Sequence, residues 1–377
     1  MTHTLPGPDG RELAERLVGI HPDTRVLRTS GYTENVIVHA AAPIRVCDCG
    51  GWTDTWFARH GRVFNIAVSP YAEARVEVFP ADAGRPPVVI DALNFGDRYA
   101  PRRVGGGWDR HPLLEAVLHR FPPPDRASIE VAVRCDVPAG ASTGTSAAVA
   151  VALVGALDRI RGGALTRREV ARQAHAVETD DLKQQSGIQD QICSAMGGVN
   201  DIVMSAYPEA NVEQIHVPDS VRSELERRLV LVFLGRTHRS SDIHERVIAR
   251  LMGLGPDCPE LDDIRRAAGE AAAAMRAGDL ERLGRAMSDN TEAQRRLHPE
   301  LVCQDAERVI AVARAHGASG WKVNGAGGDG GSLTLMGPQS PAAVARMLAA
   351  IQVAVPLGRS IPIALDGHGL RVWTDAD

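Results

Sequence analysis

Residues Pro138 to Ala148 have the composition of a phosphate-binding loop. They read PAGASTGTSAA and lie between an alternating apolar run at 129–133 and a continuous apolar run at 147–157. This order predicts a strand, a loop and a helix start, and the free N–H groups of a helix N-terminus attract phosphate. Glycine and alanine allow close backbone approach, while Ser or Thr can bind an oxyanion or magnesium. An ordinary N-capped buried helix would explain these residues equally well.

A second glycine cluster, Gly325-Ala326-Gly327-Gly328-Asp329-Gly330, matches the G-x-G-x-x-G pattern of dinucleotide-binding folds. That fingerprint needs a strand before it and a helix after it, whereas residues 332–336 here read as a strand. The sequence also has no G-x-x-x-x-G-K-[ST] pattern, which excludes a Walker-type loop. Taken alone, the cluster predicts a hairpin turn.

A third polar stretch, 236–241, follows an apolar run at 229–234 and reads RTHRSS. Its three potential cations and three hydroxyls could together hold a phosphate group. A solvated surface loop is an equally good explanation.

The surrounding pattern predicts groups of strands followed by groups of helices. We expect strands at 36–46, 62–78 (two strands around a turn at Ser69-Pro70) and 88–92, and short ones near 361–365 and 369–373. We expect helices at 11–18, 112–120, 183–196 and 341–352, three between 260 and 316, and one through about 180 that a capping box opens at Thr166 and Glu169. Strands then helices, twice over, predict an α+β chain of two domains, 1–210 and 225–377.

Composition excludes several function classes. The chain has 377 residues, enough for two domains, with 44% apolar and 24% charged residues. A net charge of −5 and 4% aromatic residues argue against nucleic-acid binding. The start lacks a signal pattern and the longest apolar run is too short for a bilayer, so we expect a cytoplasmic protein without a membrane partner. Six scattered cysteines favour free thiols over a zinc site.

Three motifs in order resemble the GHMP kinase superfamily, which includes galactokinase, homoserine kinase and mevalonate kinase. In the second motif, Ser142, Thr143 and Thr145 replace the usual glycine, leucine and first serine. The resemblance implies an α+β fold with an N-terminal half like ribosomal protein S5 domain 2 and a ferredoxin-like C-terminal half. The three motifs are Ala42-Pro43-Ile44-Arg45 with Gly50-Gly51-Trp52-Thr53-Asp54, then the 138–148 loop, then Lys322 to Gly331.

The same resemblance implies transfer of a phosphoryl group from ATP to a sugar hydroxyl with the help of Mg2+. Asp190, in a similar G-x-x-D-Q sequence, would accept the hydroxyl proton, and Arg45 would keep it ionised and stabilise the transition state. Ser146 and Glu178 would bind magnesium. Without the resemblance, Glu178 would be taken for an exposed helical acid and Arg45 for a salt-bridge residue. ATP would lie against Pro138, Gly140, Ala141, Ser142, Thr143, Gly144, Thr145 and Ser146, with its base near Asn94 and Trp108.

The expected acceptor is the anomeric hydroxyl of a sugar or sugar phosphate. The stretch GGWTDT at 50–55 is most similar to L-fucokinases and heptose-phosphate kinases, and residues 111–114 (HPLL) also resemble the latter. A heptose 7-phosphate is therefore the favoured substrate and L-fucose the alternative, for a monomer or homodimer. The residues expected to bind the substrate are Gly51, Trp52, Thr53, Asp54, Arg236, Arg239, Gly327 and Gly328.

Two alternatives of other kinds remain. A non-catalytic sugar and ATP sensor on the same fold is disfavoured by the joint presence of Asp190, Arg45 and Glu178. A decarboxylase relative of the superfamily is disfavoured by the sugar-type G-x-x-D-Q sequence.

The 236–241 stretch generates one prediction. Arg239→Ala should weaken a phosphorylated substrate far more than an unphosphorylated one, because a guanidinium group binds phosphate through charge-assisted hydrogen bonds. KM values for a sugar and its phosphate would measure this. Equal effects on both would argue against a phosphate-binding role.

Overall fold

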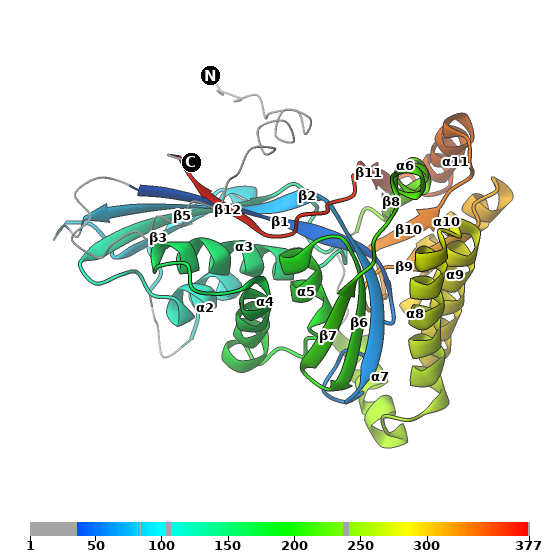
Figure 1. Cartoon of the computed structure of the whole chain (residues 1–377), viewed down its shortest axis with the longest axis horizontal. Coiled ribbons are helices and arrows are strands. Elements are labelled where there is room, and N and C mark those ends of the chain that lie inside the picture. The colour runs from blue at the N-terminus through cyan, green and yellow to red at the C-terminus, as the bar shows by residue number, and fades with distance from the viewer. Residues whose placement is uncertain (1–35, 81, 83, 103–106, 237–240, 376–377) are drawn as a thin grey trace.

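Figure 1 shows the computed structural model, which describes residues 36–375 apart from 81, 83, 103–106 and 237–240. The predicted helix at 11–18 and Arg239 lie outside the described residues. Within the described part of the chain, the strands form a large sheet and a small sheet, each covered by helices. The predicted two-domain α+β fold is confirmed.

The large sheet is organised around β2 (Gly61–Pro80), whose alternating and continuous apolar residues are buried along most of its length. β1 (Val36–Cys49) runs antiparallel beside it. β6 (Val199–Ala206) pairs with the first part of β2, and β5 (Ala127–Cys135) pairs with the second part. The sheet is completed by β3 (Val88–Ala92), which is parallel to β5, and by β4 (Asp97–Tyr99), β7 (Glu209–Gln214) and β12 (Arg371–Thr374).

The prediction of two strands around Ser69-Pro70 was wrong, because β2 continues through this dipeptide. The register between β1 and β2 shifts between Pro43 and Ile44, where Val68 and Tyr71 are the neighbouring partners. Ser69 instead donates its N–H to the Ala364 carbonyl at 2.9 Å. Proline has no N–H to donate to a neighbouring strand. It therefore lies at this break in the β1–β2 pairing, inside a strand that continues, and not at a turn.

Helices of the N-terminal half cover one face of the large sheet (Figure 1). The most buried is α3 (Thr145–Ile160), which packs on β1 and β2. The predicted capping box of Thr166 and Glu169 opens α4. The predicted helix at 183–196 is helical only from Gln189, and Lys183, where it was expected to start, has a left-handed φ of 57°. The remaining helices are α2 (Pro112–Arg120), α4 (Arg167–Ala176), a π-helical turn (Val177–Asp181) and α5 (Gln189–Met196).

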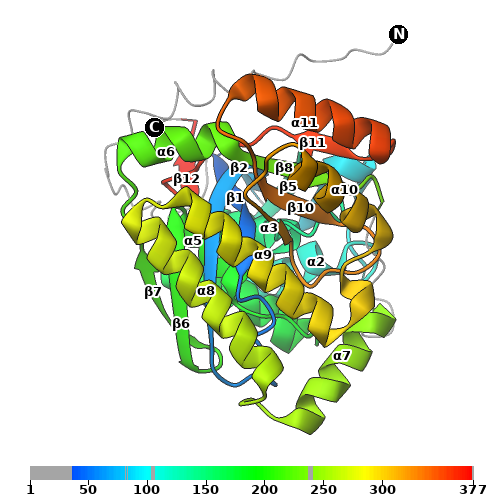
Figure 2. The same cartoon turned by 90° about the vertical axis from the view of Figure 1, so that its right-hand side faces the viewer.

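The small sheet has the antiparallel order β11-β8-β10-β9. Figure 2 shows the long helices of this half on the side nearest the viewer. Its strands are β8 (Leu229–Phe233), β9 (Gly320–Val323), β10 (Ser332–Met336) and β11 (Arg359–Ile361). The three helices predicted between 260 and 316 are present. The helices are α6 (Asp219–Arg228), α7 (Ser241–Leu254), α8 (Pro259–Ala277), α9 (Leu280–Leu297), α10 (Gln304–Ala315) and α11 (Pro341–Ala354), with 3-10 turns at Leu93–Phe95 and Pro299–Leu301.

The two halves share a hydrophobic core. Residues of β8, α8 and α9 belong to the same buried cluster as β1, β2 and α3. The predicted division between residues 210 and 225 stays a prediction, and the last strand, β12, pairs with β1 in the large sheet. Among the described residues, none of the helices has the length and apolar character needed to cross a bilayer.

Asp201 on β6 ties the large sheet to α8. Its buried carboxylate accepts hydrogen bonds from Arg62 at 2.8 and 2.7 Å and from Arg276 at 2.7 Å. Burial disfavours the anion, but the two guanidinium groups outweigh it and lower the pKa of Asp201. A lowered acid pKa stabilises the fold above the pKa of the unfolded carboxyl, and this contribution is lost as the pH falls through the folded pKa.

We predict that Asp201→Ala lowers the free energy of unfolding by about 2–4 kcal/mol at pH 7, since a buried charge-assisted network is lost. Urea unfolding would measure it. Asp263→Ala is the matched control, because Asp263 also binds two arginines but is more exposed and should cost less than about 1 kcal/mol. The Asp201 difference should shrink below pH 3.8, the ordinary value for the carboxyl; a difference independent of pH would contradict the charge-based explanation.

Candidate active site

The 138–144 loop leads from β5 directly into α3. Gly140, Ser142 and Gly144 all have positive φ, of 76°, 57° and 69°. Gly144 is the N-cap of α3, and no side chain caps the helix. The N–H groups of the first turn therefore have no side-chain cap and are available to an anion. The predicted role of the loop in ATP binding stays a prediction. Because Ser142 adopts a left-handed conformation, it occupies a position that suits the glycine it replaces.

The strand before this loop is fixed by Asn94. The Asn94 side-chain amide donates to the Cys135 carbonyl at 2.7 Å and accepts from the Cys135 N–H at 2.8 Å. Trp108 packs half-buried beside the core, with its ring edge-on to His119. The expectation that the adenine base lies near Asn94 and Trp108 stays a prediction.

Arg45 and Asp190 form a two-point ion pair beside the loop. Arg45 Nε donates to Asp190 Oδ1 at 2.8 Å and Nη2 donates to Oδ2 at 3.2 Å. Nη1 donates to the Ser142 carbonyl of the loop. A Cβ at Gly144 would lie 3.2 Å from both Arg45 and Asp190, and Gly144 has a φ of 69°, so the close contacts and the backbone conformation both favour glycine there. The structure thus brings both predicted catalytic residues against the predicted phosphate loop.

The buried Arg45 side chain stays positively charged. Its side chain is 4% exposed, and that of Asp190 is 25% exposed. Burial disfavours the Arg45 cation, but the carboxylates of Asp190 and Asp48 outweigh it and raise the pKa of Arg45. Asp190 therefore combines an ionic partner with access to solvent, as a proton acceptor requires.

Asp54 lies beneath the segment that leads to Asp190. Its Oδ2 accepts the Gln189 N–H at 3.1 Å, and a Cβ at Gly187 would stand 2.0 Å from the same oxygen. Burial, the main cause, raises the pKa of Asp54 to about 7, and the charge of Asp190 adds to the effect. Ionisation of the buried Asp54 carboxyl therefore lowers the stability of the fold.

Glu178 is the second buried carboxyl, on the π-helical turn after α4. Its Oε2 accepts hydrogen bonds from Ser186 Oγ at 2.6 Å and Gln191 Nε2 at 2.9 Å. Burial raises the pKa of Glu178 to about 7, although neighbouring donors, Ser146 among them, lower it. Glu178 Oε1 is buried without a hydrogen-bond partner among the described residues. An unpaired carboxylate oxygen near the exposed Ser146 fits the oxygen ligands that Mg2+ prefers.

Both ends of the glycine turn in the third motif, Gly325 and Gly331, lie against Ser142 of the phosphate loop. A Cβ at Gly325 would lie 3.2 Å from Ser142 Cβ, and one at Gly331 would lie 2.8 Å from Ser142 Oγ. The predicted substrate-binding residues Gly327 and Gly328 lie against Leu301 instead. The Leu301 carbonyl accepts the Gly328 N–H at 3.0 Å and would stand 2.2 Å from a Cβ at Gly327.

Three predicted substrate-binding residues of the first motif have packing contacts in the structure. Gly51 leaves room for Asp48, whose Oδ2 would lie 3.2 Å from a Cβ at position 51. Thr53 is buried and donates to the Gly50 carbonyl at 2.8 Å. Trp52 belongs to a small hydrophobic cluster, where it packs edge-on to His244. Asp54 differs from them because its carboxyl interacts electrostatically with Asp190.

Arg236 follows β8 and its side chain is 55% exposed. Its Nε lies 4.0 Å from Asp305 Oδ2. The Arg236 carbonyl accepts the Gly331 N–H at 3.4 Å, so the 236–241 stretch begins next to the glycine turn. Because Arg239 lies outside the described residues, the proposed phosphate role of this stretch stays a prediction.

Two charged residues without a predicted role lie at the centre of the site. Asp48 and Lys322 are both fully buried, and Lys322 Nζ lies 3.4 Å from Asp48 Oδ1. A usable signal was present, since each charge interrupts an otherwise apolar strand, VCDC at 46–49 and GWKV at 320–323. A charge in a buried strand needs a partner.

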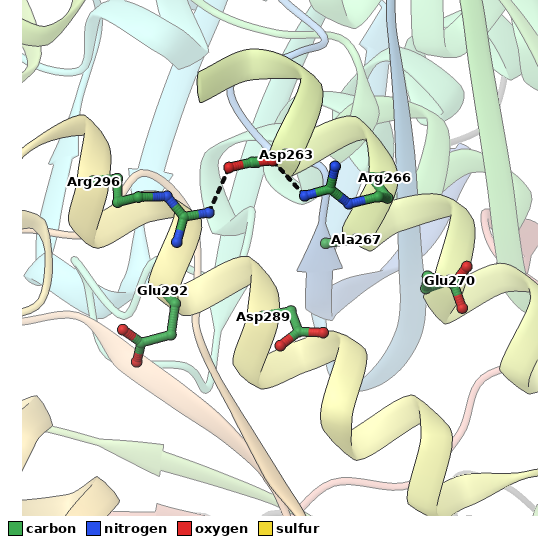
Figure 3. Close-up of a pocket in the computed structure, with 7 residues that line it drawn as sticks. All are labelled: Asp263, Arg266, Ala267, Glu270, Asp289, Glu292 and Arg296. Carbon is green, nitrogen blue, oxygen red and sulfur yellow. Dashed lines mark hydrogen bonds and ion pairs between the residues drawn. The ribbon is translucent and has the colours of Figure 1, made fainter. Parts of the chain in front are cut away.

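A shallow pocket lies elsewhere, between α8 and α9 (Figure 3). Asp263 of α8 pairs with Arg266 on the same helix and with Arg296 on α9. Its other lining residues are Ala267, Glu270, Asp289 and Glu292, so no predicted site residue lines it.

The chain matches known proteins over both halves. Residues 112–198 match the N-terminal domain of the GHMP kinases, and residues 271–352 match their C-terminal domain. The chain is 26% identical over 301 residues to a D-glycero-alpha-D-manno-heptose 7-phosphate kinase of Campylobacter jejuni, covering 78% of this chain and 87% of the relative. It is 30% identical over 254 residues to a mevalonate kinase of Thermococcus sibiricus, covering 65% and 69%. The crystal structure of a D-glycero-D-manno-heptose 1-phosphate kinase from Bacteroides thetaiotaomicron superimposes with a TM-score of 0.67 at 21% identity, over 89% of this chain and 98% of that one.

Fold and relatives together define a phosphoryl-transferring enzyme of the kinase class. The 138–148 loop, with the open N-terminus of α3, lies within the N-terminal domain match, and the Lys322 to Gly331 motif lies within the C-terminal one. The chain belongs to the GHMP kinase family.

The buried Asp54 carboxyl generates a prediction about stability and pH. Because its folded pKa of about 7 exceeds the ordinary 3.8, an energetic penalty grows as the pH rises from 3.8 to about 7 and is full above that range. Asp54→Asn should therefore raise the free energy of unfolding by roughly 2–4 kcal/mol at pH 8 and by little at pH 4. Thermal or urea unfolding at both pH values would measure it.

The exposed Asp125→Asn is the matched control and should have no such effect. A variant Asp54→Asn that is less stable than the unaltered protein at pH 8 would contradict the penalty.

Proposed function

We propose that the protein catalyses transfer of the γ-phosphoryl group of ATP to a hydroxyl of a sugar or sugar phosphate, most favourably the anomeric hydroxyl of a heptose 7-phosphate. The observation that carries the proposal is the two-point Arg45–Asp190 pair at the uncapped start of α3. This geometry joins a proton acceptor, a cation and a phosphate cradle in one place.

Each residue has a distinct task in the proposed reaction. Asp190 accepts the proton as the sugar oxygen bonds to the γ-phosphorus and the bond to the β-phosphate oxygen breaks, releasing ADP. Arg45 holds Asp190 ionised and in place, and its position next to the loop stabilises negative charge on the transferred group. Positioned donors are effective here because Arg45 is buried away from water.

The nucleotide would be held by the 138–146 loop, and Mg2+ by Glu178 and Ser146. Bound Mg2+ would neutralise phosphate charge and so favour departure of ADP. The unpaired, buried Glu178 Oε1 supports this assignment, since a bound cation would satisfy an oxygen that otherwise lacks a partner. Ser186 and Gln191 fix the other oxygen and so orient the carboxylate.

Sugar recognition is proposed for Asp54, whose carboxyl lies beside Asp190. A carboxylate can accept hydrogen bonds from two hydroxyls of one ring, and a buried carboxylate discriminates strongly against a ligand that leaves it unpaired. The heptose 7-phosphate kinase of Campylobacter jejuni, at 26% identity, supports a heptose phosphate as first choice. L-fucose or another hexose remains the alternative acceptor, and a non-catalytic sugar and ATP sensor is the alternative of another kind.

An ADP-release assay with ATP and Mg2+ over a panel of acceptors tests the proposal. The panel contains heptose 7-phosphates, L-fucose, galactose and, because of the relative in Thermococcus sibiricus, mevalonate. We expect Mg2+-dependent turnover with a heptose 7-phosphate. Asp190→Asn should lower kcat by roughly 10²–10⁴-fold while ATP affinity changes little, because it removes the base but not the cradle.

The outcomes separate the candidates. Turnover with mevalonate alone would reject the sugar, and ATP binding without any turnover would favour the sensor. Full activity in Asp190→Asn would reject Asp190 as the base.

A further inference from the structure

Asp48 and Lys322 form a buried ion pair that the proposed reaction does not yet use. Asp48 lies near the end of β1, where the register with β2 is irregular between Val46 and Cys49, and Lys322 lies on β9 of the small sheet. Both side chains are 0% exposed. Taking two charges out of water is costly, and such a pair is weak evidence for stability. Its contacts therefore indicate what it positions.

The Asp48 carboxylate has three partners, each from a different part of the site. Its Oδ1 lies 3.4 Å from Lys322 Nζ. Its Oδ2 accepts the Gly325 N–H at 2.9 Å and lies 3.6 Å from Arg45 Nη2. One carboxylate thus links the catalytic arginine to the first residue of the glycine turn.

Lys322 completes the clamp on the glycine turn. Its ammonium donates to Gln294 Oε1 at 3.0 Å and to the Val323 carbonyl. Gln294 Nε2 in turn donates to the Gly325 carbonyl at 2.9 Å. Both backbone polar groups of Gly325 are therefore held from the buried pair, and Gly325, like Gly331, lies against Ser142 of the phosphate loop.

Charge balance gives the pair a second consequence. Arg45 faces two carboxylates, Asp190 at 2.8 Å and Asp48 at 3.6 Å. Lys322 neutralises the charge of Asp48. Without Lys322, Asp48 would compete with Asp190 for the Arg45 guanidinium. With Lys322 in place, the guanidinium can direct both Nε and Nη2 to Asp190.

We propose that Asp48 and Lys322 are positioning residues: Lys322 neutralises Asp48 so that Arg45 is committed to Asp190, and Asp48 fixes the glycine turn against the phosphate loop. The inference rests on the proposed role of Asp190 as base. The charged or titratable groups that interact electrostatically with Asp190 are Arg45 on β1, Asp54 in the segment after it, Glu178 on the π-helical turn and Cys193 on α5.

Three variants test the pair. Asp48→Asn removes the charge and keeps an oxygen for the Gly325 N–H, Lys322→Met removes the cation at similar length, and the double variant has neither charge. Asp201→Asn is the matched control, because it also neutralises a buried carboxylate bound to arginine but on β6, where it joins α8. Each is assayed with the acceptor that the unaltered enzyme turns over, for kcat, KM for ATP and the pH–rate profile.

We expect Lys322→Met to lower kcat roughly 100-fold with KM for ATP within about threefold, because Arg45 is then shared between two carboxylates. Loss of a cation makes the ionised base harder to form, so the acidic limb of the profile should move up by about one pH unit. Asp48→Asn should move the acidic limb to lower pH. The double variant should return the limb to its original position and have a kcat at least about tenfold higher than that of Lys322→Met. Asp201→Asn should leave the limb unmoved.

Acidic limbs that stay in place in both single variants, or that move in the same direction, would overturn the inference, because a merely structural pair predicts no opposite shifts. If Lys322→Met fails to fold, as judged by circular dichroism, Asp48→Asn decides alone: a downward shift supports the inference and an unmoved limb overturns it. Failure of the proposed function is recognised separately, since the unaltered enzyme would then turn over no sugar in the panel.

Discussion

The buried guanidinium of Arg45 is the interaction on which the site depends. It is a charge taken out of water, and it is tolerated because two carboxylates and a loop carbonyl surround it. These partners come from β1, from α5 and from the loop before α3, segments far apart in the chain. A single cation therefore requires that the large sheet, two of its covering helices and the loop be assembled together.

The carboxyl groups around this cation are kept in unequal environments. Asp190 remains partly exposed and directly paired, whereas Asp54 and Glu178 are buried and have pKa values raised to about 7. Groups of one chemical type thus acquire different tasks from their surroundings. Ionisation of the two buried carboxyls destabilises the fold, and a bound ligand or cation would offset this loss. Binding in this site is therefore linked to the stability of the fold.

Much of this could be predicted from the sequence. The loop at 138–148, the helix at 112–120 and the capping box at Thr166 depend on local signals, and each appears where expected. The Arg45–Asp190 pair joins residues 145 positions apart, so it became visible only through the order of three motifs. Local signals failed where tertiary partners decided. Ser69-Pro70 lies within a continuous strand, and the segment before Gln189 is not helical, with Ser186 bonded to Glu178 and Gly187 against Asp54. The ion pair of Asp48 and Lys322 could not be predicted from the sequence, because it joins a strand of the large sheet to a strand of the small sheet.

The pairing of β12 with β1 has a consequence for how the chain is made. Residues 371–374 lie beside residues 38–41, which come far earlier in the sequence. Residues 371–374 are synthesised long after residues 38–41, so during translation β1 lacks this partner strand until they emerge from the ribosome. Uncovered strand edges can pair with other chains. The nascent N-terminal half is therefore expected to depend on its C-terminal strand, or on a chaperone until that strand emerges, to remain free of aggregation.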